Sequence, residues 1–452
     1  MNEAFSKAIV ISVGKSNSIE LNHAQSEFAL LLKEINYQVV EFFSQNIDSV
    51  ESSTYVGAGK LEEIASFYRR YNEQNPDSPI EIVACNFELT GLQKKCMSSL
   101  IGAEIIDRTF VILDIFEKNA KTREAKLQVH IARLQYLKSH LVDEKASYSQ
   151  VTSGSGHNKG KGEKQIELSR RQINKAITQK KKELEEIKLS RRNMRVSRLN
   201  NPIPKICIVG YTNAGKSTLL NRLINLGKES KTVLEKNALF ATLETATRSI
   251  SVYGYPSFFL TDTVGFISNL PVYLVDAFRS TLEEIKEADL LVQVVDISDP
   301  FKEEEISTTK QIIKDLEADH IPMINIYNKY DLLGGAANFL PKEDEMFVSL
   351  LDQDDVEEAL KFIVSNVTKN WEKHRILLPY SIDFASFNKE NYVVSKKEKE
   401  DGYLCDVFLN PAFKYKYLTY LQELSWSCSI SDRPHRQLVR WFYFQNQFDN
   451  SR

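Results

Sequence analysis

The segment from residue 205 to residue 217 constrains the fold of this chain more than any other. Residues 205–209 are a short apolar run, which is typical of a buried strand, and residues 210–217 fit the pattern G-x-x-x-x-G-K-S. A helix-like stretch follows. A strand, such a loop and a helix in this order are the setting of a phosphate-binding loop. The segment therefore predicts a P-loop domain with a doubly wound sheet that holds a nucleotide triphosphate.

The residue types in the loop suit phosphate chemistry. Gly210 and Gly215 allow the backbone to wrap around phosphate oxygens, whose charge is favoured by exposed N–H groups at a helix N-terminus. We expect Lys216 to reach the β- and γ-phosphates and the Ser217 hydroxyl to be one ligand of Mg²⁺. The nucleotide-binding residues predicted in this segment are Gly210, Asn213, Ala214, Gly215, Lys216, Ser217 and Thr218.

A second strand-like run, residues 258–260, ends in Thr261-Asp262-Thr263-Val264-Gly265. Asp262 at the carboxyl end of a strand suits a magnesium ligand acting through water, and the Gly265 N–H could meet the γ-phosphate. Between the two motifs lies a threonine-rich stretch, in which Thr242 is our choice for the second magnesium hydroxyl. Thr245 and Thr247 remain alternatives. The expected catalytic set is Lys216, Thr242 and Gly265.

The base is expected to be read by residues 328–331, which follow the apolar run 323–327. The Asp331 carboxylate could accept hydrogen bonds from guanine N1–H and from the exocyclic amine, a pair that adenine cannot supply. Lys329 could lie along the base and Asn328 could take N7. The backbone N–H of Ser349 is a weaker candidate for O6, since Leu350 follows where GTPases usually have Ala. The motif predicts GTP and GDP as ligands.

Two departures concern hydrolysis of the β–γ bond. Many GTPases place Gln directly after Asp-x-x-Gly to orient the attacking water, whereas this chain has Phe266 there. We therefore expect slow intrinsic hydrolysis. Asn213 resembles the Asn of potassium-activated translation GTPases, so K⁺ is a candidate cofactor; an ordinary turn residue is the alternative.

Composition places the chain among ordinary globular proteins. Its 452 residues are 42% hydrophobic, and five cysteines without C-x-x-C spacing argue against both a disulfide framework and a zinc site. Neither a secretory signal nor a run of transmembrane length is evident. A cytoplasmic protein without membrane contact is expected.

Four parts follow one another along the chain. Residues 1–108 alternate strand and helix signals and predict a small α/β domain, in which residues 57–60 begin a helix rather than a phosphate loop. Residues 109–200 predict two long helices, the first running on from Thr109. Residues 201–370 contain the nucleotide motifs, and the aromatic-rich residues 371–452 predict a small α+β domain.

The two long helices should form an antiparallel hairpin. Leu127, Ile131, Leu134 and Leu141 form one apolar stripe, and Ile166, Ile173, Ile177, Leu184 and Ile187 form another with coiled-coil spacing. Residues 153–162 predict a flexible Gly/Lys-rich tip loop. Residues 158–200 hold 14 Lys and Arg against five Asp and Glu, a charge of +9 that leaves −12 for the rest. This asymmetry favours a nucleic-acid-facing element over an ordinary solvated helix.

The chain resembles the HflX family of ribosome-associated GTPases along nearly its whole length. The residues that carry the resemblance include segments outside the general GTPase motifs, and the absence of Gln at Phe266 is part of the pattern. These segments are residues 57–64, 107–116, 122–129, 240–243 and 262–267.

The resemblance implies GTP-dependent binding to the large (50S) ribosomal subunit near the peptidyl-transferase region. It also implies splitting of 70S ribosomes under stress, with antibiotic resistance in some relatives, and a monomer off the ribosome. The tip departs from the family, because the usual Arg-Gly-Pro-Gly-Glu stretch is replaced by residues 159–163 without that Arg or Pro. Contacts with rRNA are expected through Lys159, Lys161, Arg170 and Arg171.

Two other hypotheses for the function of the chain remain. A GTP-regulated switch that binds a protein effector would not need the charge asymmetry. A P-loop ATPase or kinase would not need residues 328–331, and comparing GTP with ATP affinity would decide.

Overall fold

The computed structural model describes most of the chain, in two compact units: one built mainly from residues 1–195, the other mainly from the residues that follow. The predicted boundary at residue 200 stays a prediction, because it lies outside the described residues. Side chains are described except in 142–151, 159–166, 190–199 and at Ala246. The described ranges are 5–14, 18–47, 49–151, 159–199, 203–227, 246–252, 254–263, 265–266, 284–334 and 341–422.

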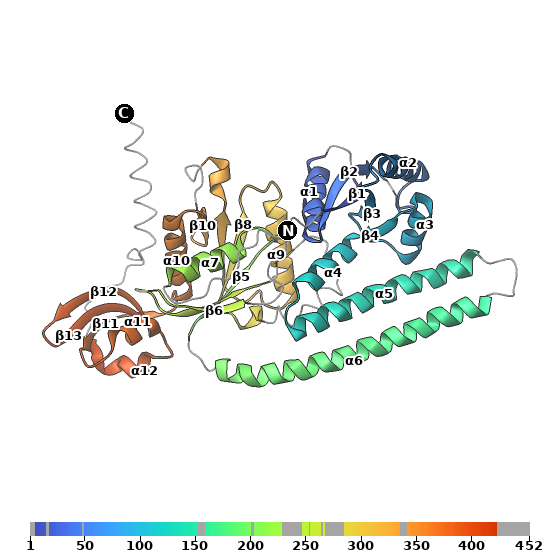
Figure 1. Ribbon diagram of the computed structural model, residues 1–452. Helices are drawn as coiled ribbons and strands as arrows, with labels where there is room; N and C mark the ends of the chain where they lie inside the picture. The colour runs from blue at the N-terminus through green and yellow to red at the C-terminus, as the bar shows by residue number, and fades with distance from the viewer. Residues whose placement is uncertain are drawn as a thin grey trace, which may run out of the picture. The chain divides into compact units, whose positions relative to one another are not determined.

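The first unit begins with a four-stranded parallel sheet of order β2-β1-β3-β4 (Figure 1). Strands and helices alternate as predicted, because parallel neighbours need a crossover between them. The strands are β1 (Ser6–Val13), β2 (Tyr37–Gln45), β3 (Ile80–Cys85) and β4 (Glu104–Asp107), and the helices are α1 (Ile19–Glu34), α2 (Ala58–Gln74), α3 (Gly91–Ile101) and α4 (Arg108–Asn119). The helix predicted to begin at residues 57–60 is α2, with Gly57 as its N-cap.

The expectation of one long helix from Thr109 is wrong. The helix α4 ends at Asn119, and a separate helix, α5 (Arg123–Val151), follows. The reason is a new cap: the Ala125 N–H donates to Thr122 Oγ1 at 3.1 Å, so the hydroxyl takes the place of a helical acceptor.

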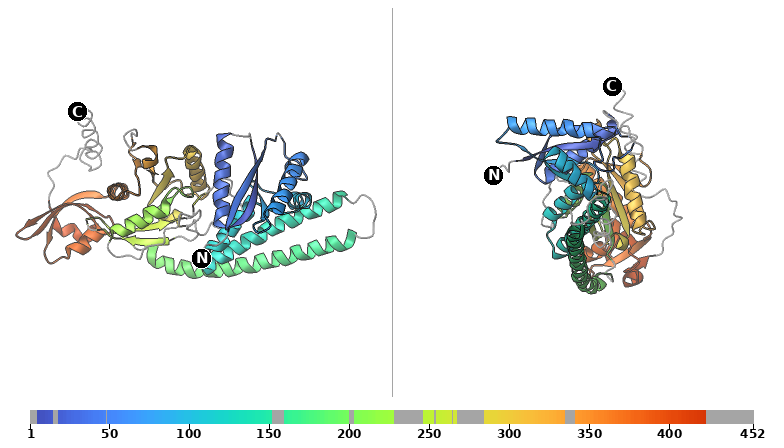
Figure 2. Two further views of the ribbon diagram at one scale, coloured as in Figure 1. Left: turned by 45° about the horizontal axis from the view of Figure 1, so that its top comes forward. Right: turned by 90° about the vertical axis from the view of Figure 1, so that its right-hand side faces the viewer.

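The helices α5 and α6 (Lys159–Leu199) form the predicted hairpin and lie side by side in Figures 1 and 2. Seven of the nine residues predicted for the seam form one apolar cluster, whereas Leu141 is described but is not part of it and the side chain of Ile166 is outside the described part. The buried residues of the cluster are Leu127, Ile131, Ile177 and Leu184, with Leu134, Ile173 and Ile187 packed against them.

The predicted tip loop is shorter than expected. Lys159 and Lys161 lie in the first turn of α6, and residues 152–158 are outside the described part. Gly160 and Gly162 also fall in this turn, whose N–H groups have no intrahelical acceptor in any case. The weak helix propensity of glycine therefore matters least there.

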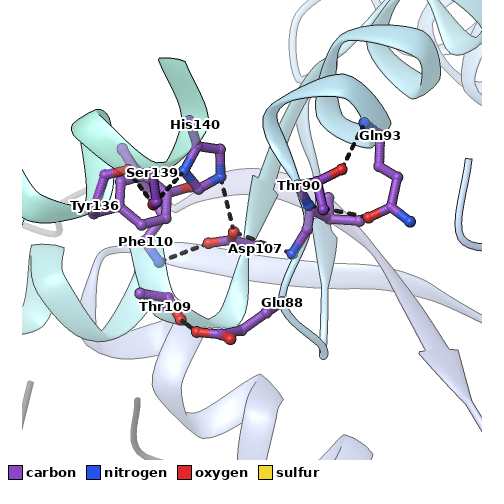
Figure 3. Close-up of polar contacts among 10 residues, drawn as sticks. Glu88, Thr90, Gln93, Asp107, Thr109, Phe110, Tyr136, Ser139 and His140 are labelled. Carbon is purple, nitrogen blue, oxygen red and sulfur yellow. Dashed lines mark hydrogen bonds and ion pairs between the residues drawn. The ribbon is translucent and has the colours of Figure 1, made fainter. Parts of the chain in front are cut away.

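Asp107 anchors α5 to the first sheet (Figure 3). As the last residue of β4 it caps α4, accepting from the Phe110 N–H at 2.8 Å, and its other oxygen lies 3.6 Å from His140 Nε2 on α5. Beside this pair, a Cβ on Gly91 would lie 2.2 Å from the His140 carbonyl oxygen. Only glycine permits α3 and α5 to approach so closely.

The second unit contains a six-stranded sheet of order β10-β9-β8-β5-β7-β6, in which only β6 is antiparallel to its neighbour. Helices α7 and α10 share one buried core with this sheet, and α9 lies on the other face (Figure 1). The predicted α/β class is confirmed. The elements are β5 (Lys205–Val209), α7 (Lys216–Leu226), β6 (Ala246–Ile250), β7 (Phe258–Asp262), η1 (Ile285–Glu287), β8 (Leu290–Asp296), α9 (Lys302–Asp315), β9 (Met323–Asn328), η2 (Tyr330–Leu333), β10 (Glu345–Phe347) and α10 (Gln353–Val367).

A smaller antiparallel sheet of order β12-β13-β11-β14 follows and confirms the predicted α+β character of this region. The helix that contains Lys389 contacts the segment just before β7, where the Ser257 N–H donates to the Lys389 carbonyl oxygen at 2.9 Å. The elements of this region are β11 (Glu372–Pro379), α11 (Phe384–Glu390), β12 (Tyr392–Lys399), β13 (Gly402–Leu409), α12 (Lys414–Tyr417), η4 (Leu418–Tyr420) and β14 (Leu421–Gln422).

Candidate nucleotide-binding site

The loop between β5 and α7 requires both of its predicted glycines. Gly210 has φ of +136°, and a Cβ there would lie 2.3 Å from the Val294 carbonyl oxygen. Gly215 has φ of +108°, and a Cβ there would lie 2.3 Å from Asn328 Nδ2. At both positions a side chain is excluded by the positive φ and by the lack of space for a Cβ. The sequence motif therefore reflects a physical requirement of this fold.

Lys216 is buried beneath this loop. Its Nζ donates to the Tyr211 carbonyl oxygen at 2.6 Å. Burial lowers the pKa of Lys216 to about 8, although the charges of Asp262 and Glu305 act in the opposite direction. A Cβ on Gly265 would lie 3.0 Å from this Nζ, so Gly265 and the amine are neighbours. An anion bound here would restore the full charge of the lysine.

Ser217 and Asp262 are in direct contact. The Ser217 hydroxyl donates to Asp262 Oδ2 at 2.8 Å, so the first turn of α7 meets the end of β7. A hydroxyl and a carboxylate are hard oxygen ligands of the kind that Mg²⁺ accepts alongside water and phosphate. The described residues contain no group of three or more His, Cys, Asp or Glu side chains placed for a metal. The contact between this hydroxyl and this carboxylate fits a magnesium ion whose other ligands are phosphate and water.

Of the three threonines considered for the second magnesium hydroxyl, the structure describes Thr247. Thr242 and Thr245 lie outside the described residues. Thr247 lies in β6, and its Oγ1 is 3.0 Å from Thr261 Oγ1 and 3.4 Å from Glu284. Because successive side chains of a strand alternate between faces, Thr261 and Asp262 point in opposite directions. Thr247 is therefore not beside the Ser217–Asp262 pair.

Phe266 is tied to the phosphate loop by its backbone. Its N–H donates to the Gly210 carbonyl at 3.1 Å, and its carbonyl accepts from the Thr212 N–H at 2.8 Å. The ring is buried. Phe266 thus fixes the segment after Asp262 against the loop, and its side chain offers no polar atom to a water molecule.

Asn328 joins three segments. Its Nδ2 donates to the Ala214 carbonyl at 2.9 Å, and its Oδ1 accepts from the Leu350 N–H at 3.1 Å. Contact of Asn328 with N7 of a base stays a prediction. Lys329 has the left-handed φ of +67°, and its Nζ pairs with Asp296 at 2.6 Å.

Asp331 is exposed at the start of η2, as a base-reading carboxylate must be. The expectation for Ser349 needs correction. Its N–H donates to Asp355 Oδ2 at 2.7 Å, so it is not available for O6 in this arrangement. The physical reason is the acidic first turn of α10, which places a strong acceptor over the loop that carries Ser349.

Three models of protein families match consecutive parts of this chain. They are described as GTP-binding GTPase N-terminal (residues 22–117), GTP-binding GTPase Middle Region (119–198) and 50S ribosome-binding GTPase (205–329). The GTPase HflX of Caldanaerobacter subterraneus is 37% identical over 376 residues, which is 83% of each chain. The GTPase HflX of Alkalihalophilus pseudofirmus is 39% identical over 363 residues, 80% of this chain and 81% of that one.

The chain belongs to the HflX GTPase family. It is accordingly a GTPase of the α/β P-loop class, a fold that binds GTP and GDP, typically with Mg²⁺. A GTP-binding protein from Sulfolobus solfataricus, solved with GDP, is 25% identical over 80% of this chain and 99% of its own, with a TM-score of 0.43.

The remaining predicted residues of this HflX GTPase lie as follows. Asn213 is exposed, with φ of +63°, a left-handed turn conformation in which Asn is enriched. Ala214 is buried in the core, and Thr218 is half-buried in the first turn of α7. The structure thus accounts for Asn213 as a turn residue, and its contact with K⁺ stays a prediction.

The predicted rRNA-contacting residues lie on α6. Arg170 and Arg171 are exposed, and Arg171 pairs with Glu167 at 2.7 Å one helical turn away. The side chains of Lys159 and Lys161 are outside the described part. None of the described helices is apolar over a length sufficient to cross a membrane.

Asp355 was not among the residues predicted for the site. This carboxylate accepts from both the Tyr330 hydroxyl and the Ser349 N–H. Its only signal in the sequence was an acidic helix start after Ser349, which is common in ordinary helices.

Proposed function

We propose that this HflX GTPase binds the large ribosomal subunit near the peptidyl-transferase region when GTP is bound. There it separates the subunits of 70S ribosomes under stress or antibiotic challenge. The observation that carries the proposal is the match of residues 205–329 to a family described as 50S ribosome-binding GTPases. The long hairpin with its cationic second helix supports it.

In this proposal the loop of residues 210–217 holds the triphosphate, and Lys216 neutralises the β- and γ-phosphates. Ser217, Asp262 and Thr242 would hold Mg²⁺, which supplies charge stabilisation for the breaking β–γ bond. Gly265 would donate its N–H to the γ-phosphate. Guanine would be selected by Asp331, with Lys329 beside it.

Slow hydrolysis in isolation follows from Phe266, whose buried ring cannot orient water. The ribosome would supply the missing positioning, so the GTP-bound state would persist until the chain is docked. A role of Asn213 in K⁺ binding is tested by the rate of hydrolysis: a rate that is faster in K⁺ than in Na⁺, and that no longer depends on the cation after Asn213→Ala, would support this role.

The second helix of the hairpin is the proposed rRNA-facing element. Among its described side chains, five cations are exposed along little more than three helical turns. Phosphate contacts of such cations release counterions, so ribosome binding should weaken steeply as salt rises. The exposed cations are Arg170, Arg171, Lys175, Lys181 and Lys182.

Sedimentation of 70S particles with the protein and a non-hydrolysable GTP analogue tests the proposal. We expect free 30S and 50S subunits, with the protein on the latter. A variant carrying Lys175→Glu and Lys182→Glu should lose this activity, whereas Lys310→Glu, an exposed lysine of α9, should keep it. An unchanged 70S profile would refute splitting, and binding that is insensitive to salt would favour a protein effector instead.

A further inference from the structure

One carboxylate joins the two segments expected to enclose the base. The Tyr330 hydroxyl donates to Asp355 Oδ2 at 2.6 Å, and the Ser349 N–H donates to the same oxygen at 2.7 Å. A second bridge runs beside it, from the Leu350 N–H to Asn328 Oδ1. The turn that carries Asp331 and the loop that carries Ser349 are therefore tied together at two points.

Apart from the ion pair between Lys329 and Asp296, the turn that carries Asp331 has few other supports. Lys329 enters it with φ of +67°, a conformation that costs free energy for a residue with a side chain. Leu332 and Leu333 are 65% and 47% exposed, so they add little burial. Tyr330 is half-buried, and its pKa is raised by burial and by the bond to Asp355, which keeps the hydroxyl protonated as a donor.

Asp355, by contrast, stands on a rigid element. It lies in the first turn of α10, where the helix dipole favours a carboxylate. The next turn of that helix is anchored in the core of the large sheet by Val356, Ala359 and Leu360, which are nearly fully buried. The carboxylate is thus a fixed point to which the turn is attached.

We propose that Tyr330 and Asp355 are positioning residues that set the selectivity of this GTPase for the 2-amino group of the purine. The proposal rests on Asp331 as the group that reads the base. Tyr330 directly precedes Asp331, so the bond to Asp355 fixes the direction of the Asp331 carboxylate. Neither Tyr330 nor Asp355 needs to touch the nucleotide.

The chemistry of the base makes this positioning measurable. A carboxylate that faces guanine accepts two hydrogen bonds, from N1–H and from the 2-amino group, whereas hypoxanthine offers only N1–H. Hydrogen bonds weaken steeply with misalignment. A turn released from Asp355 would therefore lose more affinity for GDP than for IDP, the hypoxanthine nucleotide.

The test compares GDP and IDP binding to the full chain and to Tyr330→Phe, by competition with a fluorescent GDP. We expect the preference for GDP over IDP to fall by about tenfold, the size expected for one hydrogen bond to a charged group. Tyr380→Phe is the matched control, since its hydroxyl donates to the Lys399 carbonyl at 2.7 Å in the small sheet. That control should keep the wild-type preference.

Asp355→Ala provides a second, independent variant that removes the acceptor of both bonds, and it should shift the preference in the same direction. If either variant weakens GDP and IDP equally, Tyr330 and Asp355 merely support the fold and the proposal is overturned. If the wild-type protein itself shows no preference for GDP over IDP, the assignment of Asp331 fails as well. The two failures are thereby distinguished.

Discussion

The Ser217 hydroxyl donates a hydrogen bond of 2.8 Å to Asp262 Oδ2, which brings the start of α7 to the end of β7. If this pair is the magnesium site, Ser217→Ala should weaken Mg²⁺ binding in the GDP complex by at least about tenfold, because a direct ligand is lost. GDP binding in EDTA should change little. Titration of Mg²⁺ into the complex with a fluorescent GDP measures this.

The control for that variant is Ser257→Ala, which removes a hydroxyl bonded to Ser251 at 3.2 Å in the same unit. It should leave the Mg²⁺ titration unchanged. Equal effects of the two substitutions would remove Ser217 from the metal site.

Binding of nucleotide should be accompanied by proton uptake above neutral pH. Burial lowers the pKa of Lys216 to about 8 in the free protein, and bound phosphates would raise it again. The lysine is therefore charged in both states well below pH 8, and GDP affinity should fall as the pH rises past 8. Calorimetry in buffers of different ionisation enthalpy measures the uptake.

Lys329→Arg is the control variant for this experiment, since arginine keeps a cation in the ion pair with Asp296. Uptake should persist in that variant and vanish in Lys216→Arg, if it still binds GDP, because arginine stays protonated. An affinity for GDP that does not depend on pH between 7 and 9 would contradict the expectation.

Gly215→Ala should have a larger effect on the protein than the backbone strain that it introduces. The new Cβ would lie 2.3 Å from Asn328 Nδ2 at a φ of +108°. Gly334→Ala supplies the strain without the clash, because Gly334 has φ of +84° and nothing within 4 Å of its Cβ position. We expect about 1 kcal/mol or more of destabilisation from either change and loss of GDP binding from the first alone. Urea unfolding and GDP titration of both variants separate the two effects.

The contact between His140 and Asp107 should stabilise α5 more at acidic pH. Burial acts to lower the pKa of His140, and Lys94 adds to this, but the nearby Asp107 carboxylate and the contact with the Tyr136 carbonyl raise it overall above 6.5. A raised pKa means that the stabilisation is complete below about pH 6.5 and is lost as the pH rises through the folded-state value. Protection factors from hydrogen exchange of residues 123–141, at pH 5.5 and pH 8, report it.

His140→Asn should remove this pH dependence, and His130→Asn, an exposed histidine on the same helix, should not. Protection lost equally at both pH values in His140→Asn would mean that the charge of His140 plays no part.

Strands were predictable where burial on both faces leaves a continuous apolar run. The predicted bounds of β5 (Lys205–Val209) agree with the structure, and the phosphate loop followed from its glycines. The break between α4 and α5 was missed because residues 117–124 contain neither Gly nor Pro, which are the strongest sequence signals for the end of a helix. The caps Asp107 and Thr122 were visible in the sequence, but such residues are also common within helices.

Within the site, motifs predicted which segments meet but not how their polar groups pair. Ser217 and Asp262 are 45 positions apart and were predicted to meet because both belong to known phosphate-site motifs. Asp355 belongs to no motif. Its bond to Tyr330 spans 25 positions and depends on how α10 is seated on the sheet, which no local pattern encodes.

Base selection by Asp331 is the most direct test of the proposed guanine-nucleotide site. Wild-type protein should bind GDP far more tightly than XDP or ADP. Asp331→Asn should prefer XDP, because an amide can accept from N1–H and donate to the 2-oxo group of xanthine. Competition of the three nucleotides against fluorescent GDP and XDP measures this reversal. An Asp331→Asn protein that still prefers GDP as strongly as the wild type would contradict the account.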